Sequence, residues 1–248
     1  VAVTSWSLPE PTEAAVVTRR LGTGLRPTGS AGVLPQTWVA PVDAAPRIDG
    51  KLDETIWDAA QPMVLGKLVT RGKTSPRTEA RLVHKDKVLY VGVKVDEPHM
   101  DRLKRAVTDN DGPVYGDDSI ELFISPHPPR GYFQFIVNAA GAVFDRHGHG
   151  DPKAFAAGVK TAIELGSSGW TLEAAIPMAP MGVGDELPTR WRGNIYRNRQ
   201  ASAVGKLQAW SATLSEHFDR PDYFGHWLFT PQSPWEKSES AEGEPLGI

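Results

Sequence analysis

The sequence predicts an all-β fold: a two-sheet antiparallel β-sandwich of jelly-roll or immunoglobulin-like form, with one short helix and extended N- and C-terminal arms. Many short segments between residues 80 and 230 are apolar or alternate between apolar and polar side chains, and turn sequences such as the GSSG at 166–169 separate them. Many short strands with frequent turns are typical of such sandwiches. The 248 residues are 40% hydrophobic and 23% charged, which suits a packed core and argues against global disorder.

The elements are expected in a clear order along the chain. A short helix is predicted over 53–60, with Asp53 as its N-cap. A hairpin is predicted from the strand 80–85 through Lys85, Asp86 and Lys87 into the strand 88–96. Further strands are predicted at 119–125, 131–138, 142–146, 160–165, 170–176, 192–199, 207–213 and 224–229.

Two of these strands carry polar groups opposite an apolar face. In 131–138 one face holds Phe133, Phe135 and Val137, and the other holds Tyr132, Gln134, Ile136 and Asn138. In 119–125, Ile120, Leu122 and Ile124 alternate with Ser119, Glu121 and Phe123. A carboxylate, an amide and an aromatic ring on one face could hold a polyhydroxylated ligand, but they are also ordinary residues for a wet sheet face.

Composition divides the chain into an extended Pro/Gly-rich N-terminal arm (1–40), a sandwich domain (41–230) and an extended C-terminal tail (231–248). The arms lack a sustained period and cannot bury enough apolar surface alone to offset their ordering entropy. Trp6, Trp38 and Trp235 lie in them. An indole in such a segment commonly anchors it in a groove, either on a partner or on the chain's own domain.

Charge and residue usage exclude several classes of protein. The net charge of -3 and the lack of a basic cluster argue against nucleic acid, and no run of about 18 apolar residues could span a membrane. The absence of cysteine excludes disulfides and thiolate-bound metals. It fits an extracytoplasmic bacterial protein, periplasmic or secreted to the cell surface. The start at Val1, without a signal peptide, predicts a mature exported domain.

Seven segments in order resemble family 9 carbohydrate-binding modules and their broader family-9-like (DOMON-related) relatives, over roughly residues 45–230. They are PRIDGKLDETIWDAA, LYVGVKVDEP, YGDDSIELFIS, FQFIVNAAGAVFD, GWTLEAAIPM, RGNIYR and PDYFGHWLF. The resemblance implies a non-catalytic β-sandwich. Relatives of this sandwich bind sugars, bind haem or serve as accessory domains, so the fold alone does not give the function.

The best-known members of that family hold the end of a sugar chain between two aromatic rings, with polar side chains bonding the hydroxyls. By resemblance, the two rings fall at Tyr115 and Phe218, where the family has tryptophans, and Glu121 and Gln134 match its polar residues. Asn138 lies on the same strand face as Gln134, and Ser215 falls where the family has an asparagine. Ile136 falls where the family has an arginine, which removes a bidentate donor.

Two groups of residues could bind metal. Asp96, Asp117 and Asp118 lie at strand ends, where carboxylates can coordinate structural calcium; the alternative is turn-forming, solvated aspartates. Asp145, His147, His149 and Asp151 give an H-x-H spacing suited to zinc or copper. The glycines between them favour a solvated loop instead.

These observations predict a non-enzyme that requires no cofactor beyond the calcium considered above. The sequence has no G-x-S-x-G, Walker or H-E-x-x-H motif. Because Tyr115 and Ile136 depart from the sugar-site pattern, we expect a structural or interaction subunit of a larger, extracytoplasmic and even membrane-bound assembly. It would dock on other protein subunits through 1–40 and 231–248. The alternative is a carbohydrate-binding module that holds a glycan end between Tyr115 and Phe218.

Overall fold

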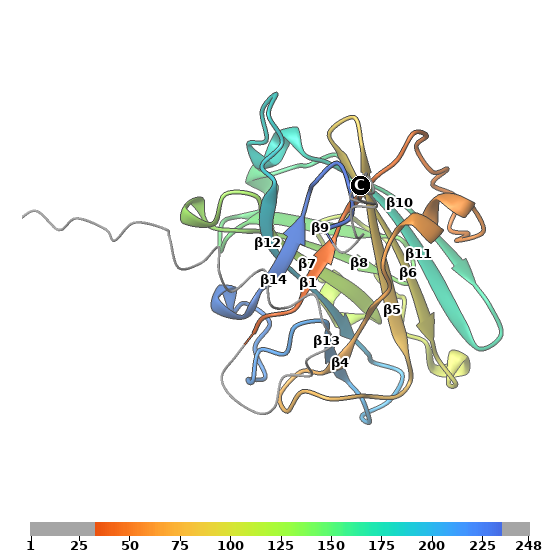
Figure 1. The fold of residues 1–248 in the computed structure, drawn as a ribbon. Helices are drawn as coiled ribbons and strands as arrows, with labels where there is room; N and C mark the ends of the chain where they lie inside the picture. Colours follow the sequence, from red (N-terminus) through yellow and green to blue (C-terminus); the bar gives the residue numbers. More distant parts are fainter. Residues whose placement is uncertain (1–32, 235–248) are drawn as a thin grey trace, which may run out of the picture. The chain divides into compact units, whose positions relative to one another are not determined.

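Residues 33–234 are described by the computed structural model, and they form two β-sheets packed face to face (Figure 1). The eight-stranded sheet has the order β1 (Gln36–Trp38), β14 (Gly225–Leu228), β12 (Arg190–Asn198), β7 (Ser119–Ser125), β8 (Phe133–Asn138) and β9 (Val143–His147). Off this path, β13 (Leu207–Ala209) pairs with β12 and with β4 (Gly66–Lys67). The all-β sandwich predicted from the sequence is confirmed.

The six-stranded sheet has the order β10 (Lys160–Leu165), β11 (Gly169–Pro177), β6 (Val88–Asp96), β5 (Thr78–Lys85) and β2 (Ala40–Pro41), and β3 (Met63–Val64) pairs with β5. The predicted hairpin is its centre. Asp86 and Lys87, both with φ near +50 to +60°, form the two-residue turn between β5 and β6. Positive φ at both central positions gives the turn the twist that antiparallel strands require.

The core lies between the sheets and confirms the predicted strand faces. Ile120, Leu122 and Ile124 of β7 and Phe135 and Val137 of β8 point inward and are fully buried. The six-stranded sheet meets them with inward side chains that include Leu82, Val91, Val93 and Leu172. Each such buried side chain contributes about 1.5–3 kcal/mol. The alternate residues of β7 and β8 therefore lie on the outer face of the eight-stranded sheet.

Helices in residues 33–234 are all short 3₁₀ turns. They are η1 (Thr55–Ala59), η2 (Met100–Arg102), η3 (Val114–Gly116), η4 (Pro128–Arg130), η5 (Pro152–Ala154), η6 (Ala179–Met181) and η7 (Pro221–Tyr223). The helix predicted over 53–60 is thus only the single turn η1. Its N-cap is Glu54 rather than Asp53, without a side-chain capping bond. Its position is set instead by Trp57, whose Nε1 donates to Glu173 of β11 at 3.1 Å.

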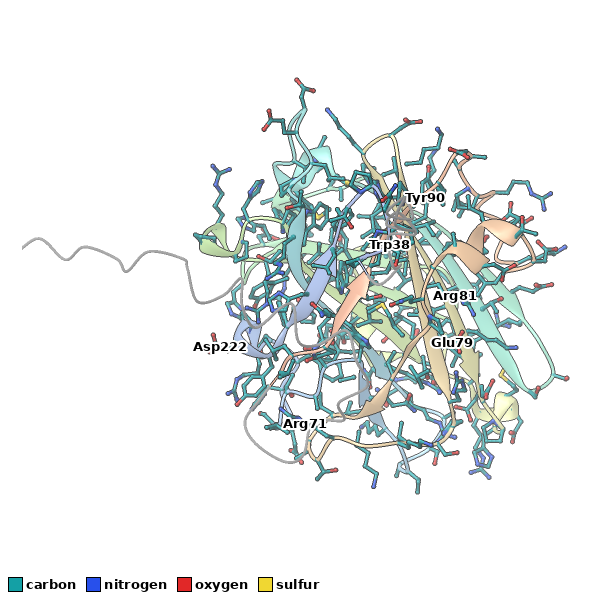
Figure 2. The ribbon with its side chains drawn as sticks, viewed as in Figure 1. Trp38, Arg71, Glu79, Arg81, Tyr90 and Asp222 are labelled. Atoms are coloured by element: carbon teal, nitrogen blue, oxygen red, sulfur yellow. The ribbon has the colours of Figure 1, made fainter. Side chains whose placement is uncertain are left out.

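The first two strands, β1 and β2, begin at residues 36 and 40, within the segment 1–40 that was predicted to be an extended arm. β1 pairs with β14 and β2 with β5, both in parallel, so residues 36–41 belong to the two sheets and the sandwich is not purely antiparallel. Trp38 Nε1 donates to the Thr230 carbonyl at 3.0 Å, and its ring packs against the buried cluster that contains Tyr90 (Figure 2). Trp38 is therefore an edge residue of the domain, whereas Trp6 and Trp235 lie outside the described residues.

One predicted strand is cut short, and this shapes the outer face. The strand predicted over 207–213 ends at Ala209. Beyond that point the side chain of Asn194 on β12 bonds the backbone of Ser211. Its Oδ1 accepts from Ser211 N at 2.9 Å, and its Nδ2 donates to the Ser211 carbonyl at 2.7 Å. A side-chain amide here replaces backbone pairing. The chain then leaves the sheet as a loop, 210–220, that runs over the outer face.

No helix among residues 33–234 is long and apolar enough to cross a membrane.

Candidate functional site

A pocket of about 220 Å³ lies on the outer face of the eight-stranded sheet, beneath the loop 210–220. We call it the Glu121 pocket. It is lined by Glu121, Phe123, Gln134, Arg146, Leu207, Glu216, His217, Phe218 and Asp219.

Strand register brings three polar side chains into this pocket. In the ladder of β7, β8 and β9, Phe123 lies opposite Gln134, and Gln134 lies opposite Arg146. Directly paired residues point to the same face of a sheet, so Gln134 and Arg146 share the outer face with Glu121. Neighbouring strands thus each place one polar group on the same wall.

These groups form a hydrogen-bonded line. Arg146 Nε donates to Gln134 Oε1 at 2.6 Å, and Gln134 Nε2 donates to Glu121 Oε2 at 3.1 Å. The line fixes the orientation of the Gln134 amide, because each end of the amide has its own partner. Glu121 Oε1 has no protein partner among the described residues and is the acceptor left for a ligand.

Glu121 is 5% exposed, and this burial raises the pKa of its carboxyl to about 7. The hydrogen bond from Gln134 and the charge of Arg146 oppose the rise, whereas the charge of Asp219 adds to it. Burial dominates because a carboxylate loses more solvation than these partners return. Glu121 is therefore a group that titrates near neutral pH inside the pocket.

Phe218 forms an aromatic platform at the pocket. Its ring stacks on Tyr196 of β12 with centroids 4.3 Å apart and planes 14° from parallel. The Tyr196 hydroxyl donates to the Phe218 carbonyl at 2.8 Å and accepts from Asn194 Nδ2 at 2.6 Å. Both the ring and the backbone of Phe218 are thus held by one buried tyrosine.

A small polar cluster contacts Asp219, which lines the pocket. His149 Nε2 lies 3.3 Å from the Tyr132 hydroxyl and 4.0 Å from Asp219 Oδ2. The contact links the turn after β9 to the loop that carries Phe218. Tyr132 also packs edge-on against His149, with centroids 6.0 Å apart.

Three of the six predicted sugar-binding residues, Glu121, Gln134 and Phe218, meet in the pocket. The other three do not line it. Asn138 is buried, with its amide engaged by Val107, Asp117, Ala140 and Ala142. Ser215 Oγ accepts from His217 N at 3.3 Å and so shapes the loop before Phe218. Tyr115, in η3, is 55% exposed.

Arg146 is the residue that sequence reasoning missed. The family resemblance places the arginine at 136, two residues past Gln134 on the same strand. Ile136 instead packs with Val114, Ala142 and Phe144, and the arginine comes from the neighbouring strand β9. The short gap between the predicted strands 131–138 and 142–146 could have revealed it, since a hairpin centred on residue 140 places residue 146 opposite residue 134.

The predicted metal ligands are dispersed. Asp117 Oδ2 accepts from Val107 N, and Asp118 accepts from the amides of Lys104 and Gln200, so both carboxylates organise backbone. Within residues 33–234 no group of three His, Cys, Asp or Glu side chains is arranged to hold a metal ion. Calcium at Asp96, Asp117 and Asp118 stays a prediction.

The segment 145–151 is only partly the solvated loop predicted for it. Asp145 and His147 belong to β9, and Asp145 is buried with Oδ2 accepting from Ala157 N at 2.9 Å. His147 stacks on Phe133, with centroids 4.5 Å apart, while His149 contacts Tyr132. Each imidazole is thus held by a different aromatic ring.

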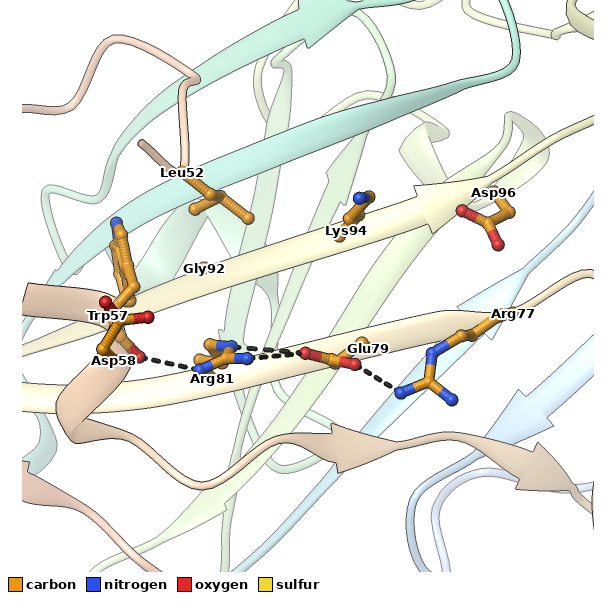
Figure 3. A pocket seen from close by; sticks show the side chains of 9 residues that line it. All are labelled: Leu52, Trp57, Asp58, Arg77, Glu79, Arg81, Gly92, Lys94 and Asp96. Atoms are coloured by element: carbon orange, nitrogen blue, oxygen red, sulfur yellow. Dashed lines mark hydrogen bonds and ion pairs between the residues drawn. The ribbon is translucent and has the colours of Figure 1, made fainter. Parts of the chain in front are cut away.

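A separate hollow of about 320 Å³ lies on the outer face of the six-stranded sheet (Figure 3). Its central charges are paired. Glu79 lies between Arg77 and Arg81, at 2.5 and 3.1 Å, and Arg81 Nη1 also donates to the Trp57 carbonyl at 3.0 Å (Figure 3). The charged side chains at the centre of this hollow are thus already bonded to one another.

A profile described as carbohydrate family 9 binding domain-like matches residues 48–230. The chain belongs to this family. Its modules are non-catalytic binding domains. None of the curated proteins matches the chain.

Solved structures agree with the fold. A putative carbohydrate-binding protein from Bacteroides uniformis is 19% identical with a TM-score of 0.63, over 79% of this chain and 99% of that one. A family 9 carbohydrate-binding module from Caldicellulosiruptor kristjanssonii, in complex with glucose, is 19% identical with a TM-score of 0.58, over 81% and 98% of the two chains. A family 9 carbohydrate-binding module from Caldicellulosiruptor kristjanssonii in complex with cellotriose is also 19% identical. Its TM-score is 0.59, over 81% of this chain and 96% of that one.

These findings correct the expectation of a structural or interaction subunit docked by its arms. That expectation rested on the loss of the arginine at 136 and of the tryptophan at 115. The family that the chain matches is one of carbohydrate-binding domains, which contradicts it. The pocket also regains an arginine at 146, so its polar wall is not depleted as the sequence indicated.

Proposed function

We propose that this chain is a carbohydrate-binding module that holds the end of a glycan in the Glu121 pocket. The observation that carries the proposal is the platform ring of Phe218 beside the hydrogen-bonded line of Arg146, Gln134 and Glu121. A pyranose has an apolar C–H face that packs on an aromatic ring and hydroxyls that need directed partners. The Phe218 ring can take the apolar face of the sugar, and the hydrogen-bonded side chains beside it can bond the hydroxyls.

The polar groups divide the work on the sugar hydroxyls. Glu121 Oε1 accepts a hydrogen bond from a sugar hydroxyl, and the guanidinium nitrogens of Arg146 that face away from Gln134 donate to hydroxyl oxygens. Bonds to charged partners are roughly twice as strong as neutral ones. The family assignment and the similar structures with glucose and cellotriose support this chemistry.

Tyr115 is the candidate for a second ring. Its carbonyl accepts from Asn198 Nδ2 at 2.6 Å, and Asn198 lies on β12 two residues past Tyr196, on the same face. Two residues of strand span roughly 7 Å. Tyr115 thus starts near the rim of the Phe218 platform, and its exposed ring is free to cover the sugar.

The domain itself is proposed to be non-catalytic and to act outside the cytoplasm, where polysaccharides are found. The family match supports a non-catalytic role, because the modules of this family are binding domains. Glycan recognition uses the carboxylate of Glu121, held by its hydrogen bond from Gln134, as a fixed acceptor.

Calorimetry with glucose, cellotriose and xylo-oligosaccharides tests the proposal. The wild-type chain is expected to bind at least one of them, and Phe218→Ala is expected to lower the affinity at least tenfold. Leu165→Ala is the control, because Leu165 is an exposed apolar residue of β10 in the other sheet. Absence of binding to the whole panel, or equal affinity of wild type and Phe218→Ala, would contradict the proposal.

A further inference from the structure

A larger hollow adjoins the Glu121 pocket. It encloses about 680 Å³ between the segment 67–75 after β4 and the segment 204–207 that leads into β13. Leu207 and Glu216 line both cavities, so the two cavities are neighbours. Strands β4 and β13 lie side by side at the lower edge of Figure 1, and Arg71 marks this region in Figure 2. We call this cavity the lysine hollow.

The lysine hollow carries three ammonium groups without partners. Lys67, Lys73 and Lys206 line it and are exposed, and within residues 33–234 none of them has a side-chain hydrogen bond or ion pair. Its lining contains a single carboxylate, Glu216. The chain as a whole carries a net charge of -3, so this local positive excess runs against the overall charge.

The adjoining pocket has the opposite balance. Glu121, Glu216 and Asp219 line the Glu121 pocket, against the one arginine, Arg146. Charge therefore changes sign from the Glu121 pocket to the lysine hollow. A neutral sugar at the first position and an anionic one at the second match this pattern.

The walls of the lysine hollow are fixed to each other. Gln208, fully buried, donates through Nε2 to the Pro76 carbonyl at 3.0 Å and to the Gly205 carbonyl at 3.5 Å. Gly205 has φ +66°, and a Cβ there would lie 2.5 Å from the Ser75 carbonyl oxygen. Only glycine allows this approach. The ammonium groups thus stand on a preorganised frame, which lowers the ordering cost of binding.

Apolar surface accompanies the charge. Val69 and Val204 are 44% and 75% exposed, and both line the hollow. Side chains of this kind pack against the C–H face of a pyranose, while ammonium groups pair with an acidic substituent. The combination suits a sugar ring that bears a negative charge.

We propose that the lysine hollow is a second subsite, which takes an anionic sugar unit next to the unit held in the Glu121 pocket. The anion is a carboxylate or a sulfate ester. This inference rests on the proposed function, because the first unit anchors the chain that reaches the hollow.

Calorimetry with three matched probes tests it: cellotriose, cellotriose with only the C6 of its middle unit oxidised to a uronate, and cellotriose sulfated only at O6 of that middle unit. The wild-type chain is expected to bind an anionic probe about tenfold more tightly than cellotriose, and high salt should remove this difference. Comparison of the uronate with the sulfate identifies which anion the hollow takes.

The variant Lys67→Gln/Lys73→Gln/Lys206→Gln is expected to lose the tenfold preference and to keep its affinity for cellotriose. The control Lys51→Gln/Lys94→Gln/Lys160→Gln makes the same change in net charge at exposed lysines elsewhere and is expected to keep the preference. Equal binding of neutral and anionic probes by the wild type, or loss of the preference in the control, would overturn the second subsite. If cellotriose still binds through Phe218 in that case, the proposed function stands; if no probe binds, both fail.

Discussion

The ring of Phe218 stacks on the ring of Tyr196 at 4.3 Å, and the same tyrosine holds the Phe218 backbone through its hydroxyl. One residue of the sheet thus fixes both the plane and the position of a ring carried by a loop. Loops normally place functional side chains loosely. This double contact makes the Phe218 platform part of the rigid sandwich.

Removing only the hydroxyl should separate the two roles of Tyr196. In Tyr196→Phe the stacking ring remains, but the Phe218 carbonyl loses its donor, a loss of about 1 kcal/mol. We expect glycan affinity to fall several-fold by calorimetry, with a smaller loss than in Phe218→Ala. Asn194 Nδ2 keeps its bond to the Ser211 carbonyl, so the fold should persist. A loss as large as that in Phe218→Ala would show that the ring contact alone does not hold the loop.

Tyr115→Ala tests the second ring. Because Tyr115 does not line the Glu121 pocket, we expect this variant to weaken glycan binding less than Phe218→Ala does. The exposed ring carries little of the fold, so the midpoint of thermal unfolding should stay unchanged. An unchanged affinity, with glycan still bound through Phe218, would remove Tyr115 from the site.

Glycan affinity should depend on pH through Glu121. Its pKa of about 7 means that the ionised acceptor, which bonds hydroxyls more strongly, prevails only above neutral pH. Affinity is therefore expected to rise between about pH 6 and pH 8, around that pKa. Glu121→Gln should flatten this profile. A wild-type profile that stays flat over the same range would contradict the role of Glu121.

Stability should change with pH in the opposite direction. The pKa of Glu121 is higher in the folded chain than in the unfolded one, so ionising this carboxyl in the folded chain costs stability. The cost reaches its full value above about pH 7. This cost disappears as the pH falls from about 7 toward 4.5, and each unit of pKa difference corresponds to about 1.4 kcal/mol. Urea unfolding of wild type and Glu121→Gln should show the variant gaining relative stability at pH 8 and not at pH 5. The same relative stability at both pH values would argue against a raised pKa.

Restoring an arginine at 136 should harm the protein rather than help it. Ile136 is 2% exposed and packs with Val114, Ala142 and Phe144, so Ile136→Arg places an unpaired charge among apolar side chains. We expect a loss of about 3 kcal/mol or more in urea unfolding. Arg146→Gln should cost less stability, about 1 kcal/mol for the lost hydrogen bond to Gln134, and should weaken glycan binding. Intact folding with tighter glycan binding in Ile136→Arg would contradict this assignment.

The sequence predicted the sandwich because strand periodicity and turn chemistry are local. The alternation in 119–125 and 131–138 correctly separated the core face from the outer face that holds Glu121 and Gln134. It did not show that this outer face is itself buried. The path of the loop 210–220 was not predictable from local pattern, because the side chain of Asn194 ends β13 from another strand. Arg146 was missed for a related reason: its place depends on pairing across strands and not on spacing along one strand.

The two sheets are joined at one end by a buried ionic cluster, which sequence periodicity did not reveal. Arg197 of β12 donates to Glu97 Oε2 at 2.8 Å and to the Asp96 carbonyl at 3.0 Å, and Arg199 donates to both oxygens of Glu97. Burial alone would raise the pKa of Glu97, but hydrogen bonds from Arg199 and His99 N and the arginine charges lower it. Glu97 therefore stays ionised at neutral pH and compensates two buried cations.

Glu97→Gln removes that compensation and is expected to cost about 3–5 kcal/mol in urea unfolding. Arg47→Gln is the control, because Arg47 forms only exposed ion pairs worth at most about 1 kcal/mol. In the wild type the stabilisation by Glu97 should be complete above its unfolded pKa and be lost as the pH falls through its lowered folded pKa. Equal effects of the two substitutions would mean that water reaches the cluster and screens it, and the two sheets would then be held together by their apolar core alone.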